Sequence, residues 1–250
     1  MGQLHTAITT ATVKRVAQAD ALDSYLRGRR FERQKEQPLL YNENKSYIHY
    51  NKGSLVLYAL SDYIGTKKFN NILSSYIDKV AFQEAPYTTS LEFTEHLRQR
   101  TPDSLQYLIY DMIETITLYN NYVTDYEVSK LENGNYRVNF SANVIKYRTT
   151  GYGKTNYKNY ENCQIKYDYE KDDETTIKLR SLPLKDYVEV GVFTQNEDGE
   201  EEVLYLEKHK ITEINNEFSI EVNKKPTSVG IDPYNKLIDR DSDDNRKEVE

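Results

Sequence analysis

The sequence has no tryptophan, two methionines and a single cysteine, Cys163, among its 250 residues. One cysteine excludes an intrachain disulfide and a cysteine-rich zinc site. The longest uninterrupted apolar run is the six residues 55–60, whereas a membrane-spanning helix needs about twenty. No charged and then apolar leader opens the chain, so no signal peptide is expected. We therefore expect a soluble segment that does not itself insert into a membrane.

The chain is acidic and rich in tyrosine. Its 33 lysine and arginine residues are outnumbered by 40 aspartates and glutamates, which leaves a net charge of −7. That balance disfavours a general nucleic-acid binder, because the phosphate backbone repels an acidic surface. The 23 tyrosines and 7 phenylalanines are too many for an unfolded chain. Charge is also uneven, because residues 1–118 carry a net +1 and residues 119–250 a net −8.

Two kinds of periodicity divide the chain at the same place. Residues 1–118 show apolar side chains at helical spacing, with a predicted helix that ends at Gly65 and another that opens at Thr101-Pro102-Asp103. Residues 119–240 alternate apolar and polar side chains, as in 136–144 and 188–192, with turns predicted at Asn133-Gly134 and 196–199. This pattern predicts an α+β multidomain chain: an N-terminal helical bundle or solenoid followed by a β-sandwich. Residues 241–250 have little apolar content, and we expect a disordered acidic tail.

Four features resemble known sites without completing their patterns. Residues 151–155 lack the first glycine and the strand–helix context of a phosphate-binding loop, so a hairpin turn is expected there. Asp239, Asp241, Asp243 and Glu250 have calcium-loop spacing without the central glycine or flanking helices. Cys163 has no cysteine or histidine nearby in the sequence. The four histidines are scattered, and none forms an H-E-x-x-H pair: His5, His49, His96 and His209. We therefore predict no metal site in this chain.

The segment 47–56, YIHYNKGSLV, carries the most chemical information. It is a polar, aromatic approach that ends in Gly53 and runs into a strongly apolar predicted helix. Gly53 allows close backbone packing or an unusual φ at the helix start. Tyr50 would then lie just before a rigid buried element, which suits a phenol aimed at a ligand. The alternative is that Tyr47 and Tyr50 are two of many tyrosines and pack at a domain edge.

The run Tyr50-Asn51-Lys52-Gly53 resembles the Y-x-K-G segment of the aminopeptidase-N-like zinc metallopeptidases, the gluzincins. The similarity continues through the stretches before and after it and covers nearly the whole chain except residues 1–20. The subgroup that it resembles most is bacterial and carries a transporter-permease-like membrane region before the peptidase. These stretches carry the similarity: 22–29, 36–39, 55–65, 86–93, 108–116, 231–233, 237–240 and 244–245.

The resemblance implies a role for Tyr50 as a transition-state donor, whose hydroxyl hydrogen-bonds the oxygen of the scissile carbonyl, with Lys52 and Gly53 as its structural support. It also implies that zinc is bound by an H-E-x-x-H motif and a later glutamate upstream of the matched region, and none of these occurs here. The chain is therefore interpreted as the C-terminal part of a zinc aminopeptidase: the end of a thermolysin-like catalytic domain (1–118) and the following β-sandwich (119–240). Alone it is expected to be inactive.

The implied partners are the upstream catalytic and membrane regions of the same polypeptide and a peptide substrate, and the parent protein is expected to be associated with a bacterial membrane. Two other interpretations stay open. The chain can be a non-catalytic β-sandwich that binds peptides or glycans through exposed tyrosines. The parent can also have lost zinc and serve as a scaffold. Tyrosines considered for such a surface are Tyr152, Tyr157, Tyr160, Tyr167 and Tyr169.

Overall fold

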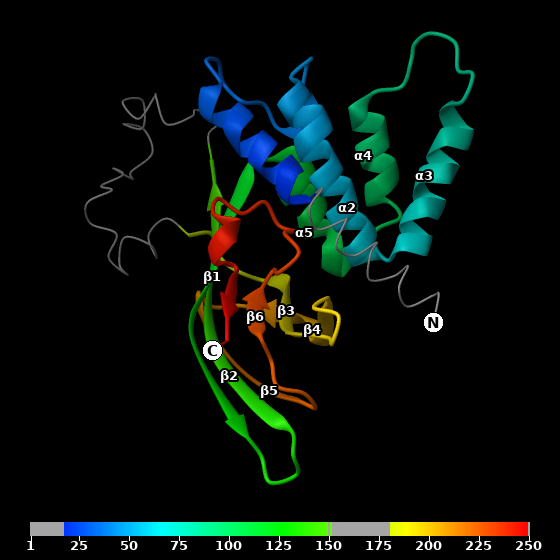
Figure 1. The fold of residues 1–250 in the computed structure, drawn as a ribbon. Helices are drawn as coiled ribbons and strands as arrows, with labels where there is room; N and C mark the ends of the chain where they lie inside the picture. Colours follow the sequence, from blue (N-terminus) through cyan, green and yellow to red (C-terminus); the bar gives the residue numbers. More distant parts are fainter. Residues whose placement is uncertain (1–17, 150, 152–180, 250) are drawn as a thin grey trace. The chain divides into compact units, whose positions relative to one another are not determined.

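The computed structural model describes residues 18–149, 151 and 181–249 (Figure 1). These residues fall into two units. The helical unit comprises residues 21–117 with 148, 149 and 151, and the sheet unit comprises residues 18–20, 118–147 and 181–249. The secondary structure is α+β, with two antiparallel sheets. Cys163 and the five tyrosines considered for a binding surface lie outside the described residues, as does His5.

The helical unit contains ordinary, 3₁₀ and π-helical segments. Residues 18–31 are helical. The elements that follow are η1 (Leu39–Tyr41), η2 (Tyr47–Lys52), α2 (Gly53–Ile64), α3 (Thr66–Val80), α4 (Ser90–Arg98), η3 (Asp103–Leu105), α5 (Gln106–Ile109) and η4 (Tyr110–Glu114). Of the short segments, η1 and η3 are 3₁₀ helices, whereas η2 and η4 are π-helices. The core of the unit is made by side chains that are almost fully buried, among them Leu22, Ile48, Leu55, Leu60, Leu97 and Leu108.

Local signals explain two of the helix boundaries in this unit. Gly65 has a φ of +94°, a conformation that side-chain-bearing residues rarely adopt, and it separates α2 from α3 as predicted. The side chain of Thr89 accepts a hydrogen bond from the backbone N–H of Glu92 and caps α4. Thr101 was expected to cap the fifth helix, and that prediction is wrong. Its hydroxyl donates instead to the carbonyl oxygen of Leu97 at the end of α4, and the expected helix is divided into η3, α5 and η4.

The sheet unit combines five strands of eight or more residues with two short ones. They are β1 (Thr117–Lys130), β2 (Tyr136–Arg148), β3 (Asp186–Gln195), β4 (Glu201–Ile211), β5 (Asn215–Val222), β6 (Ser228–Ile231) and β7 (Arg246–Glu248). One sheet has the order β1-β2-β5 and the other has the order β4-β3-β6-β7. A register shift interrupts the β3–β4 pairing at Val192 and Phe193. The turn predicted at Asn133-Gly134 joins β1 to β2, with φ of +87° at Gly134. Val188, Val190 and Val192 in β3 are fully buried, as predicted, but the intervening Glu189 and Gly191 are buried too, so β3 lacks the exposed face that an alternating strand would have.

The end of the chain differs from the expected disordered tail. Residues 242–244 form the 3₁₀ helix η6, and β7 pairs antiparallel with β6. Asn245 is 1% exposed, and its carbonyl oxygen accepts a hydrogen bond from the backbone N–H of Ile231. The low apolar content was misleading because backbone pairing, the buried Asn245 amide and the contacts of Arg246 with Glu201 and Phe193, rather than apolar side chains of the segment, hold it in place.

Candidate functional site

Tyr50 lies on the outer face of the π-helix η2. Within η2 the side chains of Ile48 and Lys52 are buried, whereas His49 and Tyr50 face outward. Tyr50 is 70% exposed. The His49 ring lies beside it, with 4.3 Å between the ring centroids and 55° between the planes. A phenol hydroxyl in this position is able to donate a hydrogen bond to a ligand from solvent.

The π-helical turn runs directly into α2. The backbone N–H of Gly53 donates to the carbonyl oxygen of Ile48, five residues earlier, which is the spacing that defines a π-helix. Residues 46, 52 and 53 all have helical backbone angles, so η2 and α2 form one continuous rod. Single π-turns inside α-helices are rare and are frequent at functional sites. The apolar pattern of the sequence gives no signal for this extra residue per turn.

Gly53 does not play the local role expected of it. Its φ is −58°, which any residue adopts in a helix, so no unusual backbone angle is needed. A Cβ atom placed on Gly53 would lie 3.7 Å from the carbonyl oxygen of Ile48 and 3.8 Å from a methyl carbon of Leu39. These are ordinary van der Waals distances. Neither reason for a glycine at this position, close packing or strain, operates here.

Lys52 is fully buried below Tyr50. Its side chain is 0% exposed, and its Nζ atom makes no hydrogen bond within the described part of the chain. Nζ lies over the ring of Tyr25, 5.5 Å from the ring centroid. Burial lowers the pKa of Lys52 to about 8, although the Glu36 carboxylate opposes the shift. Lys52 therefore loses its proton at a lower pH than an exposed lysine does.

Glu36 is the acidic centre of the same cluster, and it is also fully buried. The Tyr25 hydroxyl donates to its Oε1 atom over 2.5 Å, and Arg29 Nε donates to Oε2 over 2.6 Å. The backbone N–H of Glu36 donates to the carbonyl oxygen of Gly151 over 2.8 Å. Burial raises the pKa of Tyr25 well above its ordinary value, and the Glu36 charge adds to this, so the phenol keeps its proton. No pattern in the sequence singles out Tyr25, Arg29 or Glu36 as a site residue, although all three lie in stretches that carry the resemblance.

Tyr47 anchors the first residue of η2. Its ring stacks on Tyr25 with 6.1 Å between centroids, and its hydroxyl donates to Glu32 Oε2 over 3.0 Å. Lys45 Nζ donates to the same carboxylate oxygen over 2.6 Å. A Cβ atom on Gly28 would lie 2.5 Å from Cβ and Cγ of Tyr47, so only glycine fits there. The packing role that was considered for both Tyr47 and Tyr50 therefore applies to Tyr47.

The remaining histidines of the described residues lie elsewhere. His96 is buried in α4, with its Nε2 atom 2.9 Å from the Ser75 hydroxyl oxygen. His209 lies in β4 of the sheet unit. Within residues 18–149, 151 and 181–249, no group of three histidine, cysteine, aspartate or glutamate side chains is placed to hold a metal ion. The described part of the chain thus offers no donor set for zinc.

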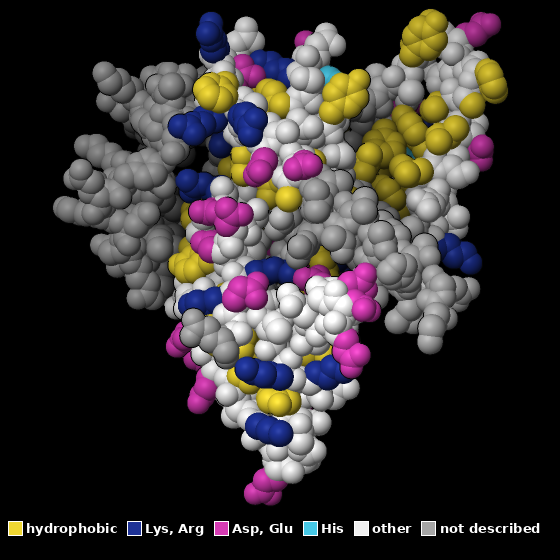
Figure 2. All heavy atoms as spheres, viewed as in Figure 1, with side chains coloured by type: hydrophobic (Ala, Val, Ile, Leu, Met, Phe, Trp, Pro, Cys, Tyr) yellow, Lys and Arg dark blue, Asp and Glu magenta, His cyan; other side chains and the backbone are white. Residues whose placement is uncertain are grey.

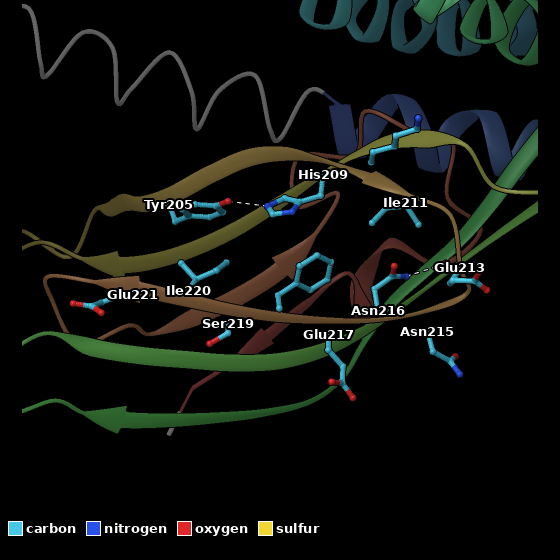
Figure 3. A pocket seen from close by; sticks show the side chains of 12 residues that line it. Tyr205, His209, Ile211, Glu213, Asn215, Asn216, Glu217, Ser219, Ile220 and Glu221 are labelled. Atoms are coloured by element: carbon cyan, nitrogen blue, oxygen red, sulfur yellow. Dashed lines mark hydrogen bonds between the residues drawn. The ribbon is translucent and has the colours of Figure 1, made fainter.

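A shallow hollow of about 570 Å³ lies between β4 and β5 in the sheet unit (Figure 3). Tyr205 and His209 project into it from β4, and the Tyr205 hydroxyl lies 2.7 Å from His209 Nε2. The His209 ring meets Phe218 of β5 edge to face, with 5.3 Å between centroids. Since β4 and β5 are each the last strand of their sheet among the described strands, the hollow lies between two sheet edges.

Exposed apolar side chains gather at the hairpin of α3 and α4, and Figure 2 shows apolar groups over these elements. The face of α3 that is buried contains only Phe69 and Ile72. The C-terminal half of α3 therefore contributes little to the core of the helical unit. The side chains that are at least half exposed in this region are Ile77, Phe82, Tyr87 and Leu91.

No protein-family model matches the chain, and no curated protein matches it in sequence. In the part of the chain that the structure describes, no helix combines the length and the apolar character needed to cross a membrane.

Proposed function

We propose that this chain is the C-terminal part of a zinc aminopeptidase of the gluzincin type, in which Tyr50 is the transition-state donor. The observation that carries the proposal is the Y-x-K-G run 50–53 together with the placement of its tyrosine. Tyr50 is exposed on a continuous helical rod whose neighbouring residues, Ile48 and Lys52, are buried. A donor held in this way keeps its direction while a substrate binds.

In this proposal the chain's own contribution to peptide hydrolysis is electrostatic. The Tyr50 hydroxyl donates a hydrogen bond to the carbonyl oxygen of the scissile bond as that oxygen gains negative charge. The described residues hold no zinc ligand set, so zinc would be bound by the upstream region of the same polypeptide. The chain alone is then inactive, and the upstream catalytic and membrane regions are its partners.

The architectural part of the proposal concerns the two units. The helical unit would be the end of a thermolysin-like catalytic domain, and the two sheets of the sheet unit would face each other as a β-sandwich. The supporting observation is that β4 and β5, joined by a short connection, belong to different sheets. A chain that changes sheet between consecutive strands is typical of sandwiches.

The decisive experiment replaces Tyr50 by phenylalanine in the polypeptide that carries this chain and its upstream region. We expect kcat for hydrolysis of an aminoacyl p-nitroanilide to fall about 10²- to 10³-fold with little change in KM, because the lost hydrogen bond acts only in the transition state. Tyr87→Phe is the matched control, since Tyr87 is equally exposed at 74% and lies between α3 and α4. An unchanged kcat in Tyr50→Phe would refute the assignment.

A second candidate function is binding of peptides or glycans by the sheet unit. It is favoured by the hollow between β4 and β5, where Tyr205, His209 and Phe218 present aromatic faces. The test is titration of the isotope-labelled chain with tetra-alanine and with chitotetraose, followed by NMR. Shift changes confined to β4 and β5, and lost in Tyr205→Ala, would support binding, whereas an unaffected spectrum with both probes would exclude these two ligand classes.

A further inference from the structure

The buried ammonium of Lys52 is not explained by an ordinary ion pair. A buried charge that lacks hydrogen bonds is costly, because the protein does not replace its water. Lys52 Nζ is buried and makes no hydrogen bond within the described residues. Glu36 does not need Lys52 as a counter-ion, since Arg29 already forms an ion pair with it over 2.6 Å. Neutralising Glu36 therefore does not explain the charge of Lys52.

Both ends of η2 contact the same aromatic ring. Tyr47, the first residue, stacks on Tyr25 with 6.1 Å between centroids. Lys52, the last residue, places Nζ 5.5 Å from the centroid of that ring, a distance at which a cation is attracted to the π-face. Tyr25 is in turn fastened by its hydroxyl to Glu36. The π-turn is thus held at its start by stacking and at its end by a cation–π contact, and Tyr50 lies between the two contacts.

The charged groups around Lys52 come from two segments. The helical residues 18–31 supply Tyr25 and Arg29, and the segment before η1 supplies Glu36. Glu36 attracts the ammonium, and Arg29 repels it by a smaller amount. Protonation of Lys52 changes the attraction at only one end of η2, because the stacking of Tyr47 on Tyr25 involves no charge on the lysine.

We propose that Lys52 is a positioning residue: its ammonium holds the π-turn η2, and η2 directs Tyr50. The buried charge lowers the stability of the helical unit. The structural claim concerns this chain alone, and its catalytic consequence rests on the proposed function. When Lys52 loses its proton, the cation–π contact and the attraction to Glu36 vanish, and Tyr50 changes its direction. The charged form is the one that orients Tyr50.

A fluorine label at position 50 tests the structural claim directly. Tyr50 is replaced by 4-fluorophenylalanine, which has no ionisable group, and its ¹⁹F shift is followed from pH 5 to pH 10. We expect a step with a midpoint within about one unit of pH 8, where Lys52 titrates. The step should be absent in Lys52→Met and in Lys52→Arg, which stays protonated throughout, and it should persist in Lys68→Met, an exposed lysine on α3.

The His49 ring is a second titratable neighbour of the label, at 4.3 Å. The same titration in His49→Gln separates the two groups. A step near pH 8 that is kept in His49→Gln and lost in Lys52→Met supports the proposal. A step that survives in Lys52→Met, or the absence of any step near pH 8 in the parent chain, overturns it.

Stability and catalysis complete the test. We expect the urea midpoint of Lys52→Met to be equal to or higher than that of the parent, because methionine fills the site without a buried charge.

In the polypeptide with its upstream region, kcat of this variant should fall at least tenfold while KM changes little. Loss of kcat in Tyr50→Phe but not in Lys52→Met overturns this inference alone. An unchanged kcat in Tyr50→Phe removes the proposed function and leaves the fluorine result to decide the role of Lys52.

Discussion

At the scale of single residues, the cluster beneath Tyr50 separates two uses of a buried polar group. The Glu36 carboxylate is satisfied on both oxygens, by the Tyr25 hydroxyl and by Arg29 Nε. Such fully bonded groups rigidify their surroundings. Lys52 lacks any comparable hydrogen bond within the described residues. Glu36 therefore belongs to the framework of the site, whereas Lys52 is the member of the cluster whose state can change near neutral pH.

Tyr25→Phe tests the framework role. The substitution keeps the ring that contacts Tyr47 and Lys52, and it removes the hydroxyl that bonds Glu36 Oε1. A buried carboxylate oxygen then lacks its donor, and the free energy of unfolding should fall by about 1–3 kcal/mol. Urea unfolding measures the loss. Tyr87→Phe, at an exposed position, should stay within about 0.5 kcal/mol of the parent. An equally small effect of Tyr25→Phe would show that the hydroxyl is not needed.

At the scale of elements, the contact between the helical residues 18–31 and η2 depends on a glycine, Gly28. Gly28 leaves the space in which Tyr47 lies, because a Cβ there would be 2.5 Å from Tyr47 Cβ. Real Cβ atoms do not approach so closely. The contacted atom, Tyr47 Cβ, is bonded directly to the backbone, so rotation of the Tyr47 side chain cannot move it away. Gly53, which attracted attention in the sequence, has room for a methyl group.

A pair of glycine-to-alanine variants distinguishes these two positions. Gly28→Ala should destabilise the helical unit by about 1–3 kcal/mol, because it forces Tyr47 away from Tyr25. Gly53→Ala should instead stabilise it by about 0.4–1 kcal/mol, since φ is −58° and alanine restricts the unfolded chain. Thermal unfolding of both variants decides the order. A Gly53→Ala variant less stable than Gly28→Ala would contradict the packing described for η2.

At the scale of the whole molecule, three aspartates of the sheet unit, of which Asp232 and Asp239 are buried and Asp244 is exposed, make its stability depend on pH. Burial raises the pKa of Asp239 to about 7, and the neighbouring Asp244 adds to the shift. Partial desolvation together with the Asp241 charge raises the pKa of Asp244 to about 6. Asp232 shifts in the same direction through burial. A folded-state pKa above the unfolded value means that the folded unit binds more protons, so its stability falls as pH rises.

Asp239→Asn measures this dependence. The stabilisation linked to the Asp239 proton is complete below the ordinary pKa of 3.8 and is lost as pH rises through about 7. The free energy of unfolding of the parent should therefore decrease between pH 5 and pH 8, and the decrease should be smaller in Asp239→Asn. The absolute stability of the variant should also fall, because both carboxylate oxygens accept backbone N–H groups, from Asn121 and Asp241.

The matched control is Asp198→Asn, at an exposed position in the turn between β3 and β4. It should leave the difference between pH 5 and pH 8 unchanged. A parent chain that becomes more stable from pH 5 to pH 8 would show that Asp239, Asp244 and Asp232 do not dominate the pH dependence of the sheet unit.

Local signals in the sequence predicted much of the secondary structure. Gly65, Asn133-Gly134 and the alternation of valines in 188–192 have short-range causes, namely backbone freedom and side-chain period. The same signals failed for the fifth helix, where Thr101 bonds the preceding helix, and for residues 241–250, which pair with a distant strand. For Thr101 the competing partner is local, the carbonyl oxygen of Leu97 four residues earlier, whereas residues 246–248 gain their order by pairing with β6.

For the candidate site, the sequence by itself determined the position of Tyr50 before an apolar helix and the identity of Lys52 and Gly53 beside it, because these follow from residue order. Only the tertiary structure decided that η2 is a π-turn, that Lys52 is buried against Tyr25, and that Gly28 rather than Gly53 is the glycine that packing requires. The physical reason is that burial, cation–π contact and steric fit depend on segments 15 to 30 residues apart meeting in space, which no local pattern records.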